Sequence, residues 1–407
     1  MTADRSSRFP LTPDQWHAVS ASFLGWTLDA FDFFVAVFLV ETLAAQFHVS
    51  ASKIIDTTWA TLAMRPVGAV IFGFLADRYG RRTPLMANVV FFSVVELLCG
   101  FSTSYTMFFI LRTIYGIGMG GEWGVGSSLA MESVPPKWRG TISGIVQSGY
   151  SSGYLLAAIA AKFILPLWGW RAMFWAGGLP ALLAFYIRWK VKETEAWKQN
   201  RMPGFGSIAK AAAAHWKLFV YLIGLMALMN FLSHGTQDLY PHFLQSEHGF
   251  STSTVANIAI FYNVGALVGA LTFGKLSEHI GRRRSLVAAT VLALCVIPAW
   301  AFGKTLGMLA LGAFLLQVGV QGAWGIIPAH LNELSPGAVR GLLPGLAYQL
   351  GNFVASPVNR IEDRLHRHFG YSRALAGFEI AVIVLLALVV SIGPESKGKE
   401  FLTERQT

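Results

Sequence analysis

Charged residues are scarce in this chain of 407 residues, which is 54% hydrophobic and only 13% charged. Soluble domains carry roughly 25% charged residues, so the composition excludes an ordinary soluble protein and indicates an integral membrane protein. Cysteine is also rare. Cys99 and Cys295 lie in different apolar runs, and they predict no disulfide framework. Metal-binding and nucleotide-binding motifs are missing too, so the sequence predicts no metal and no cofactor.

Apolar runs of about 20 residues are abundant, and this is the length that crosses the hydrocarbon core of a bilayer. The first run contains two aspartates and is too long for a signal-peptide core, so we expect it to be retained. About twelve runs can be placed, near residues 18–40, 54–76, 84–103, 105–130, 141–165, 171–189, 217–241, 252–275, 285–303, 305–330, 341–359 and 374–392. They predict an all-α integral membrane protein with twelve transmembrane helices.

Two polar loops occur twice with the same spacing. The stretch 73–85 returns as 274–286, and the motif at 132–140 returns at 333–341, in both cases 201 positions later. Because two separate loops keep one spacing, we infer that half of the chain was duplicated. A parallel repeat between long apolar runs is typical of transporters built from two bundles around a midplane site.

The repeat predicts two pseudo-symmetric six-helix bundles, at residues 1–189 and 217–407, joined by a polar linker at 190–216. The net charge is +10, but most basic residues lie beside membrane spans, so the charge is not a nucleic-acid footprint. Lysine and arginine collect at the termini and in the even-numbered connections. By the positive-inside rule, both termini and the linker are cytoplasmic, in a cytoplasmic (inner) membrane. The basic segment 360–373 does not follow this rule, and we interpret it as an external charged turn.

Several motifs together resemble the major facilitator superfamily. They are Gly-x-x-x-Asp-Arg-x-Gly-Arg-Arg at 73–82, the Arg-x-x-x-Gly run at 112–116, and the two Glu-x-x-Pro-x-x-x-Arg-Gly loops. The sequences at 191–194 and 394–398 narrow the resemblance to the sugar and metabolite:proton symporters of that superfamily. The resemblance implies a monomeric transporter whose two bundles rock around a central site. The second copy departs from the pattern at 278–279, where Glu-His replaces Asp-Arg.

The loop charges have two interpretations. They could simply fix the orientation of the chain in the membrane. The resemblance implies more, namely a cytoplasmic network of ion pairs that favours the outward-open state, in which near-surface pairs act together because each alone contributes little. The residues of this predicted network are Asp77, Arg81, Arg82, Glu132 and Arg139.

Ionisable side chains inside membrane spans cost roughly 2.5–3.5 kcal/mol each on insertion scales, so each is a candidate functional residue. They are Asp29, Asp32, Arg65, Glu96, Arg112, Glu122, His234 and Asp238. In the first half, acids outnumber bases. The surplus indicates that at least one carboxylate carries a proton for part of the cycle.

Asp29 and Asp32 are three residues apart and so lie on one helix face, where they would titrate as a coupled pair. The resemblance to sugar:proton symporters implies that Asp32 pairs with Arg112 and releases it when protonated. The alternative is a static buried ion pair. Glu96 is interpreted as a structural partner.

A polar stripe runs along the seventh apolar run: Asn230, His234, Gln237 and Asp238 follow helical spacing. It resembles the motif Asn-x-x-Ser/Thr-His-x-Ser/Thr-Gln-Asp of the lactate and pyruvate:proton permeases, which share a family with the sialic acid symporters. His242 stands where those permeases have a later threonine, which weakens the match in specificity.

The same resemblance implies three further substrate contacts. Gln349 and Asn352 have the spacing of two residues that influence which acid the permeases accept, and Arg65 matches an arginine that matters in them. An arginine can bind a planar carboxylate with two parallel hydrogen bonds, which a lysine cannot do.

The sequence therefore predicts a symporter that imports a short monocarboxylate, lactate or pyruvate, with one proton. Substrate would contact Arg65, Asn230, His234, Gln237, Gln349 and Asn352, and the proton would be coupled through Asp29, Asp32, Arg112, His234 and Asp238. Alternatives are a symporter for an aromatic or sialic acid, or for a sugar or polyol, although a neutral solute would leave Arg65 without an anion. Another alternative is a non-transporting nutrient receptor with the same fold, but such sensors tend to carry long soluble tails, whereas this sequence ends soon after Phe401. No ATPase motif and no nucleophile–base arrangement are found, which excludes ATP-driven transport and argues against an enzyme.

Overall fold

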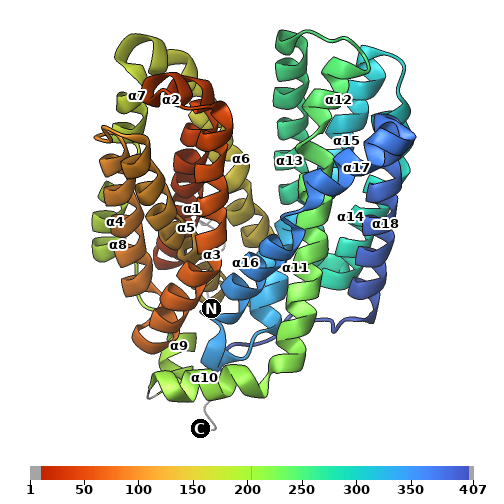
Figure 1. Ribbon diagram of the computed structural model, residues 1–407. Coiled ribbons are helices and arrows are strands. Elements are labelled where there is room, and N and C mark those ends of the chain that lie inside the picture. The colour runs from red at the N-terminus through yellow and green to blue at the C-terminus, as the bar shows by residue number, and fades with distance from the viewer. Residues whose placement is uncertain (1–10, 203, 403–407) are drawn as a thin grey trace, which may run out of the picture.

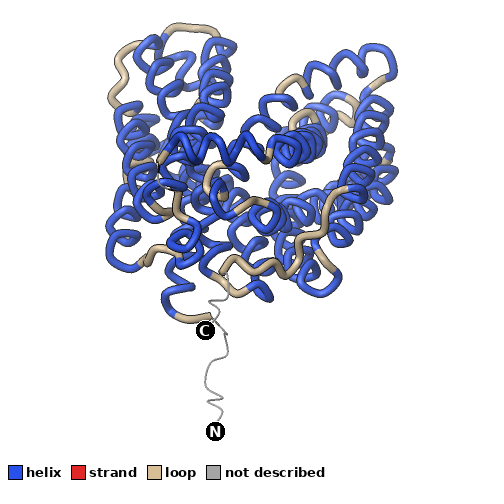
Figure 2. The backbone as a smooth tube through the Cα atoms, turned by 90° about the horizontal axis from the view of Figure 1, so that it is seen from below, coloured by secondary structure: helices blue, strands red, loops and turns tan. Residues whose placement is uncertain are grey.

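The computed structural model describes residues 11–202 and 204–402, and this part of the chain is helical with no strand (Figure 2). Each of the twelve predicted apolar runs falls on helical segments. The first group of helices comprises α1 (Pro13–Phe38), α2 (Val40–Phe47), α3 (Ala51–Tyr79), α4 (Arg82–Cys99), α5 (Tyr105–Ser133), α6 (Arg139–Phe163), α7 (Leu165–Ala176) and α8 (Ala181–Lys190). The second comprises α11 (Trp216–Gln237), α12 (Tyr240–Ser246), α13 (Thr252–Ile280), α14 (Arg282–Phe302), α15 (Leu306–Leu334), α16 (Leu343–Ala355), α17 (Val358–Phe369) and α18 (Tyr371–Ile392).

The two groups stand side by side, separated at one end and joined at the other (Figure 1). The linker helices α9 (Glu195–Asn200) and α10 (Phe205–Ala214) lie at the joined end, which we call the linker face. Across the groups, α6 packs against α13 and α15, and α16 packs against α3 and α5. A side-chain carbon on Gly124 would lie 2.7 Å from the Cα of Gly345. Glycine therefore lets the backbones of the two halves touch, as small residues do in membrane interfaces.

The duplication is visible in how the helices begin and turn. Gly80 and Gly281 end α3 and α13 with φ of 102° and 99°, a region that residues with a side chain avoid. Ser104 caps α5 by accepting from the Met107 amide, and its counterpart Thr305 caps α15 in the same way. The repeated sequence thus produces repeated geometry.

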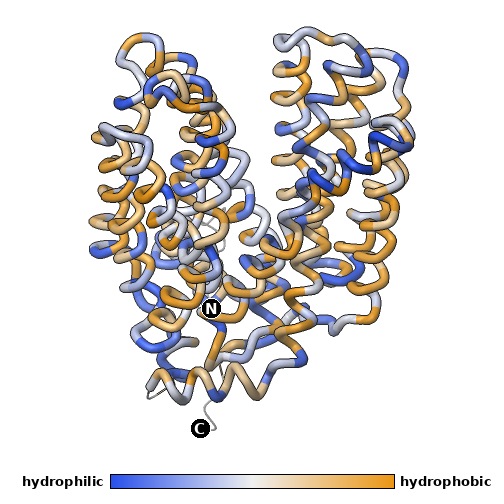
Figure 3. The backbone as a smooth tube through the Cα atoms, in the orientation of Figure 1, coloured by the Kyte–Doolittle hydropathy of each residue, from blue (hydrophilic) through white to orange (hydrophobic). Residues whose placement is uncertain are grey.

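The helices are mostly hydrophobic, as Figure 3 shows, and eight of those in the described residues are long and apolar enough to cross a membrane. Two predicted spans are broken instead. The run 171–189 divides into α7 and α8 at a Gly-Gly-Leu-Pro sequence, and 341–359 divides into α16 and α17 at Ser356-Pro357. Glycine destabilises a helix because it loses more conformational freedom on folding, and proline lacks the N–H that a helix hydrogen bond requires.

The predicted external turn after residue 359 is wrong, because α17 continues as a helix to Phe369. Its sequence is strongly hydrophilic, as Figure 3 shows. Its arginines, residues 360, 364 and 367, are exposed, whereas Val358 and Glu362 are buried. The charges are thus those of the polar face of an amphipathic helix, and they do not mark a turn.

Candidate substrate and proton sites

Arg65, on α3, is a buried cation with free hydrogen-bond donors. It is 4% exposed, and its Nε and Nη2 atoms have no partner. Its guanidinium lies 5.3 Å from the ring centroid of Tyr348 on α16. Asp29 of α1 and His234 of α11 are close enough to interact with it electrostatically. Arg65 therefore lies between the two halves, and it can still bind an anion.

The Tyr348 ring beside Arg65 belongs to a group of aromatic rings from both halves. Trp26 stacks on Tyr150 with centroids 5.4 Å apart. The ring of Tyr348 lies 4.8 Å from Trp123 and 5.5 Å from Trp324. We call these five residues the aromatic cluster. Its flat apolar faces can pack against a planar ligand while Arg65 holds a charged group.

The first-half carboxylates lie deeper in the N-terminal bundle. Asp29 and Asp32 are both fully buried. The Tyr115 hydroxyl donates to the Asp29 carbonyl at 2.9 Å and to its Oδ1 at 3.2 Å. Neither carboxylate oxygen of Asp32 has a hydrogen-bond partner. Asp32 is therefore the carboxylate in this pair with the least compensation for its charge.

The ion pair expected between Asp32 and Arg112 is not formed. Arg112 instead pairs with Glu96 of α4, with Nη1 and Oε2 2.7 Å apart and both side chains fully buried. Gly177 leaves room for Asp32 beside this pair: a side-chain carbon there would lie 2.6 Å from Asp32 Oδ1 and 2.5 Å from Glu96 Cγ. Glu96 thus occupies the position beside Arg112, and Asp32 borders the pair.

A pocket of about 260 Å³ lies between α3 and the second half. His234 and Asp238 line it from α11, with His234 Nδ1 3.2 Å from Asp238 Oδ2. Asn352 lines it from α16, and Asn359 of α17 donates to Asp238 Oδ2 at 3.1 Å. Three of the predicted site residues therefore come together around one cavity, which also contains apolar side chains such as Trp59.

The predicted polar stripe on α11 divides into two parts. His234 and Asp238 line the pocket, whereas Asn230 is 2% exposed and donates to the Met226 carbonyl at 2.7 Å. Gln237 donates to the carbonyl and hydroxyl oxygens of Ser233, at 3.2 Å each. Asn230 lies one turn before His234, and Gln237 lies about 100° around the helix from Asp238, so the pocket is lined by neither of them.

Gln349 is a second buried polar group without a partner. It is 1% exposed, and both its side-chain oxygen and nitrogen lack hydrogen bonds. It follows Tyr348 on α16, three residues before Asn352. A buried amide left unpaired costs free energy, so Gln349 remains a candidate for binding a polar ligand.

Two matching ion-pair networks lie at the linker face. Arg81 bonds Asp77 at 2.7 Å and Glu132 at 2.8 Å. In the second half, Arg282 bonds Glu333 at 2.9 Å. All of these side chains are almost completely buried. Breaking such a pair would leave an uncompensated charge, which costs far more than breaking a surface pair.

The networks are also connected across the two halves. Arg340 lies 3.4 Å from Glu132, and Arg139 lies 3.8 Å from Glu333. Arg82, predicted as a member, forms no ion pair in the described residues; it donates to the backbone carbonyl of Arg188. Four of the five predicted residues therefore belong to the networks, and the fifth anchors the end of α8.

Two acids bind helix N-termini of the opposite half. Asp77 accepts from the amides of Gly341 and Leu342 at 2.7 and 3.0 Å, just before α16. Its counterpart Glu278 accepts from the amide of Thr141 at 2.7 Å, in the first turn of α6. A carboxylate stabilises a helix N-terminus because the unpaired amides carry partial positive charge.

The segment after α18 crosses the linker face. The Phe401 ring lies between Arg139 and Arg340, whose guanidinium carbons are 3.5 and 3.8 Å from its centroid. Glu395 accepts from the amides of Arg282 and Arg283 at 3.0 and 3.1 Å. Burial raises the pKa of Glu395, but the backbone amides that bond it outweigh this effect and leave the pKa below its ordinary value.

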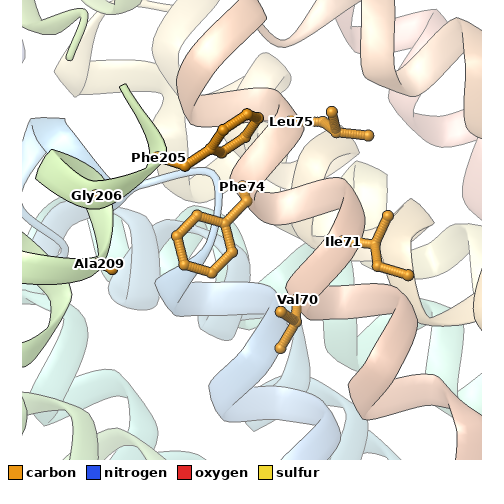
Figure 4. A pocket seen from close by; sticks show the side chains of 7 residues that line it. All are labelled: Val70, Ile71, Phe74, Leu75, Phe205, Gly206 and Ala209. Carbon is orange, nitrogen blue, oxygen red and sulfur yellow. The ribbon is translucent and has the colours of Figure 1, made fainter. Parts of the chain in front are cut away.

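A larger groove of about 510 Å³ lies between α3 and α10 (Figure 4). Its lining residues are Val70, Ile71, Phe74, Leu75, Phe205, Gly206 and Ala209. None of these side chains carries a charge or a hydrogen-bonding group. The groove is therefore suited to apolar chains such as those of lipids, and it does not compete with the Arg65 region as a site for an acid.

Sequence reasoning missed two features of the interior. The aromatic cluster comes from five different helices, and no local pattern joins its members. Glu362 and Glu379 are both buried in the second half. Glu379 could have been found, because it is the single acid in α18, the helix with the highest mean hydropathy, 2.7 over its most apolar window.

Comparisons with known proteins agree with this architecture. The chain is 32% identical over 90% of its length to a carboxylic acid transporter protein homolog of Saccharomyces cerevisiae, and it spans 64% of the length of that relative. It is 28% identical to a probable 4-methylmuconolactone transporter of Cupriavidus pinatubonensis, covering 95% of this chain and 92% of the relative. It is 27% identical to the sialic acid transporter NanX of Escherichia coli, covering 96% of each.

A solved structure has the same fold. The proton:xylose symporter XylE, bound to 6-bromo-6-deoxy-D-glucose, matches with a TM-score of 0.78 at 20% identity, over 95% of this chain and 98% of that one. The model of the Major Facilitator Superfamily matches residues 21–358. The predicted all-helical membrane fold is thus confirmed, and the chain belongs to the Major Facilitator Superfamily as a transporter, not an enzyme.

Proposed function

We propose that this transporter carries a short monocarboxylate, lactate or pyruvate, inward across the cytoplasmic membrane together with one proton. The observation that carries the proposal is Arg65: a buried cation with unpaired donors at the meeting point of the two halves. An anion bound there offsets the cost of burying the guanidinium. Relatives named for carboxylic acids, a muconolactone and sialic acid support an organic acid as the substrate.

In this mechanism, the carboxylate binds Arg65, and Gln349 and Asn352 contact the hydroxyl or keto group. Asp32 takes up the proton, because it is buried and unpaired, and the His234–Asp238 pair shares in the coupling. One anion and one proton moving together carry no net charge. The networks at the linker face close the cytoplasmic side while the opposite side is open, and the positive-inside rule supports this orientation.

A second candidate is a planar aromatic or unsaturated acid. The aromatic cluster favours it, because stacked rings stabilise a flat ligand more than a small hydroxy acid. Relatives named for niacin and for cis,cis-muconate agree with this option. A neutral sugar or polyol is disfavoured, since it would leave Arg65 without a counter-charge.

Uptake into proteoliposomes tests these proposals. Radiolabelled lactate, benzoate, sialic acid and a polyol would be offered with and without an acidic outside, using empty liposomes as the control. We expect gradient-driven accumulation of lactate. Accumulation of benzoate alone would support the second candidate, and uptake of the polyol alone would contradict both.

The coupling role of Asp32 has its own test. Asp32→Asn should still exchange labelled for unlabelled lactate at equal pH, but it should no longer accumulate lactate along a proton gradient. His234→Ala should impair exchange as well, because His234 lines the pocket. Asp14→Asn is the matched control, since Asp14 is an exposed aspartate of the same helix, paired with Lys192. If Asp32→Asn still accumulates lactate, the coupling must be assigned to His234 and Asp238.

A further inference from the structure

Two carboxylates are buried in the second half without any cation. Glu362 of α17 is 1% exposed and Glu379 of α18 is fully buried. None of their four side-chain oxygens has a hydrogen-bond partner, and neither residue forms an ion pair. Burying one ionised carboxylate is costly, and burying two side by side is more so.

The two groups face the same small space beside α11. A side-chain carbon on Gly235 would collide with Oε1 of Glu379 and would lie 3.0 Å from Oε1 of Glu362. Glu362 also acts electrostatically on Glu379. The same side-chain carbon on Gly235 would lie 3.0 Å from the ring of Phe378, so one side of the space is apolar. The absence of a side chain at Gly235 therefore leaves room for the two carboxyl groups.

Among the described residues, no basic side chain forms an ion pair with either glutamate, and the arginines of α17 and α18, residues 360, 364, 367 and 373, are exposed. On α11 the nearest ionisable groups are His234 and Asp238, and Asp238 is an acid that acts on Glu362. On α17, His366 stacks on Tyr371 with ring centroids 3.4 Å apart.

The other helix that packs on α18 is α14. Its arginines, residues 282–284, lie in its first turn at the linker face, where the backbone amides of Arg282 and Arg283 donate to Glu395. Cys295 is its one other ionisable residue, and it is exposed. The pair must therefore be neutralised by something other than a basic side chain.

We propose that Glu362 and Glu379 bind one proton between them and form a proton site of the second half, separate from Asp32. One carboxyl group carries the proton and donates it to the carboxylate of the other, so that the pair has a single negative charge. Two acids in close contact in an apolar site share a proton for this reason.

The pair is connected to the pocket through α17. Asn359, one turn before Glu362, donates to Asp238 Oδ2, and Val358 and Asn359 line the pocket. Loss of the proton would add a negative charge behind Asp238 and would disfavour an anion in the pocket. This consequence for transport rests on the proposed function, whereas proton binding does not.

Infrared difference spectroscopy of the purified wild-type protein at neutral pH tests the proton directly. We expect the carbonyl band of a protonated carboxyl group, shifted in heavy water, to lose intensity in Glu362→Gln and in Glu379→Gln. The matched control is Asp363→Asn, because Asp363 is a neighbouring exposed acid paired with Arg367 on the surface. An unchanged band in both glutamate variants would overturn the proposal, and so would equal loss in the control.

Lactate transport gives the second readout. In the wild type, KM should rise roughly threefold to tenfold from acidic to alkaline pH, as one added charge acts over a partly screened distance. Because Asp32 adds a pH dependence of its own, Glu379→Gln should reduce this rise rather than abolish it, and Asp363→Asn should keep it in full. A rise in Glu379→Gln as large as that of the wild type would overturn the link to the pocket. If the wild type transports no lactate, the proposed function fails, and the infrared band still decides whether the pair holds a proton.

Discussion

The two halves of the molecule are near copies at the linker face and different inside. Arg81 bonds Glu132 at 2.8 Å, and at a spacing of 201 residues Arg282 bonds Glu333 at 2.9 Å. The following turns match as well, because Glu193 accepts from the amides of residues 81 and 82 as Glu395 does from those of residues 282 and 283.

Within the bundles this correspondence is lost. Arg112 and Glu96 of the first half correspond to Ala313 and Ile297 of the second. Asp32 corresponds to Ser233.

The second half also has a buried acid that the first half lacks. Glu379, in the second half, corresponds to Gly178 of the first. To close the interface at the linker face, each of the two similar halves supplies the same kind of ion-pair network. The binding of one substrate and one proton that we propose does not require this, so the two interiors can differ.

The largest effect on stability is expected from removing one partner of the Arg112–Glu96 ion pair, which the second half lacks. Arg112→Ala should lower the free energy of unfolding by about 3–5 kcal/mol, because it leaves Glu96 buried without a partner. The double variant Arg112→Ala/Glu96→Ile copies the second half and should lose less than half as much. Denaturant unfolding in detergent measures both. Equal losses in the single and double variants would contradict the pairing.

The next effect concerns Arg65, whose counterpart is Ala266. Arg65→Lys keeps the charge but loses the bidentate geometry, which we expect to weaken carboxylate binding by about 1.5–3 kcal/mol. The KM for lactate should therefore rise roughly tenfold or more. Arg78→Lys, at the linker face, is the control and should leave KM unchanged. A normal KM in Arg65→Lys would remove Arg65 from the binding site.

The sequence was sufficient for the membrane fold, the duplication and most of the linker-face network. Glycines 80 and 281 and the helix caps follow local rules that repeat at a fixed spacing, so they could be predicted. The pairing of Arg112 could not. Asp32 and Glu96 are both acids of neighbouring helices, and the difference between them depends on helix rotation and on the space beside Gly177.

The interior was harder to predict for a second reason. The members of the aromatic cluster lie far apart in the chain, and each alone resembles an ordinary apolar residue of a span. Breaks in helices also matter: the interruption at Ser356-Pro357 turns Glu362 inward on α17, which a continuous eleventh span followed by a turn would not do. The positions of the aromatic cluster and of Glu362 therefore depend on contacts between helices that lie far apart in the sequence.

A smaller difference is expected between the two acids that bind helix N-termini across the halves. Asp77→Asn should weaken its bonds to the amides of Gly341 and Leu342 by about 1–2 kcal/mol, since a neutral acceptor replaces a charged one. Glu278→Gln should have less effect at Thr141, because Glu278 is only partly buried and forms no ion pair in the described residues. Hydrogen–deuterium exchange of these amides measures both. Equal acceleration in the two variants would contradict the difference.

The smallest effect should come from Glu395, which is exposed at the surface of the linker face. Its pKa is lowered in the folded protein because backbone amides bond the charged form, despite partial burial. A group of this kind stabilises the fold above its ordinary pKa, near 4.5, and the contribution is lost as pH falls below that value. Thermal unfolding of the wild type at neutral and acidic pH should therefore show a modest acid destabilisation, part of which disappears in Glu395→Gln. Glu193→Gln tests the corresponding turn of the first half, where Glu193 accepts from the amides of residues 81 and 82. If Glu395→Gln loses as much stability on acidification as the wild type, the amides around Glu395 do not favour its charged form, and the likeness of the two turns is one of shape alone.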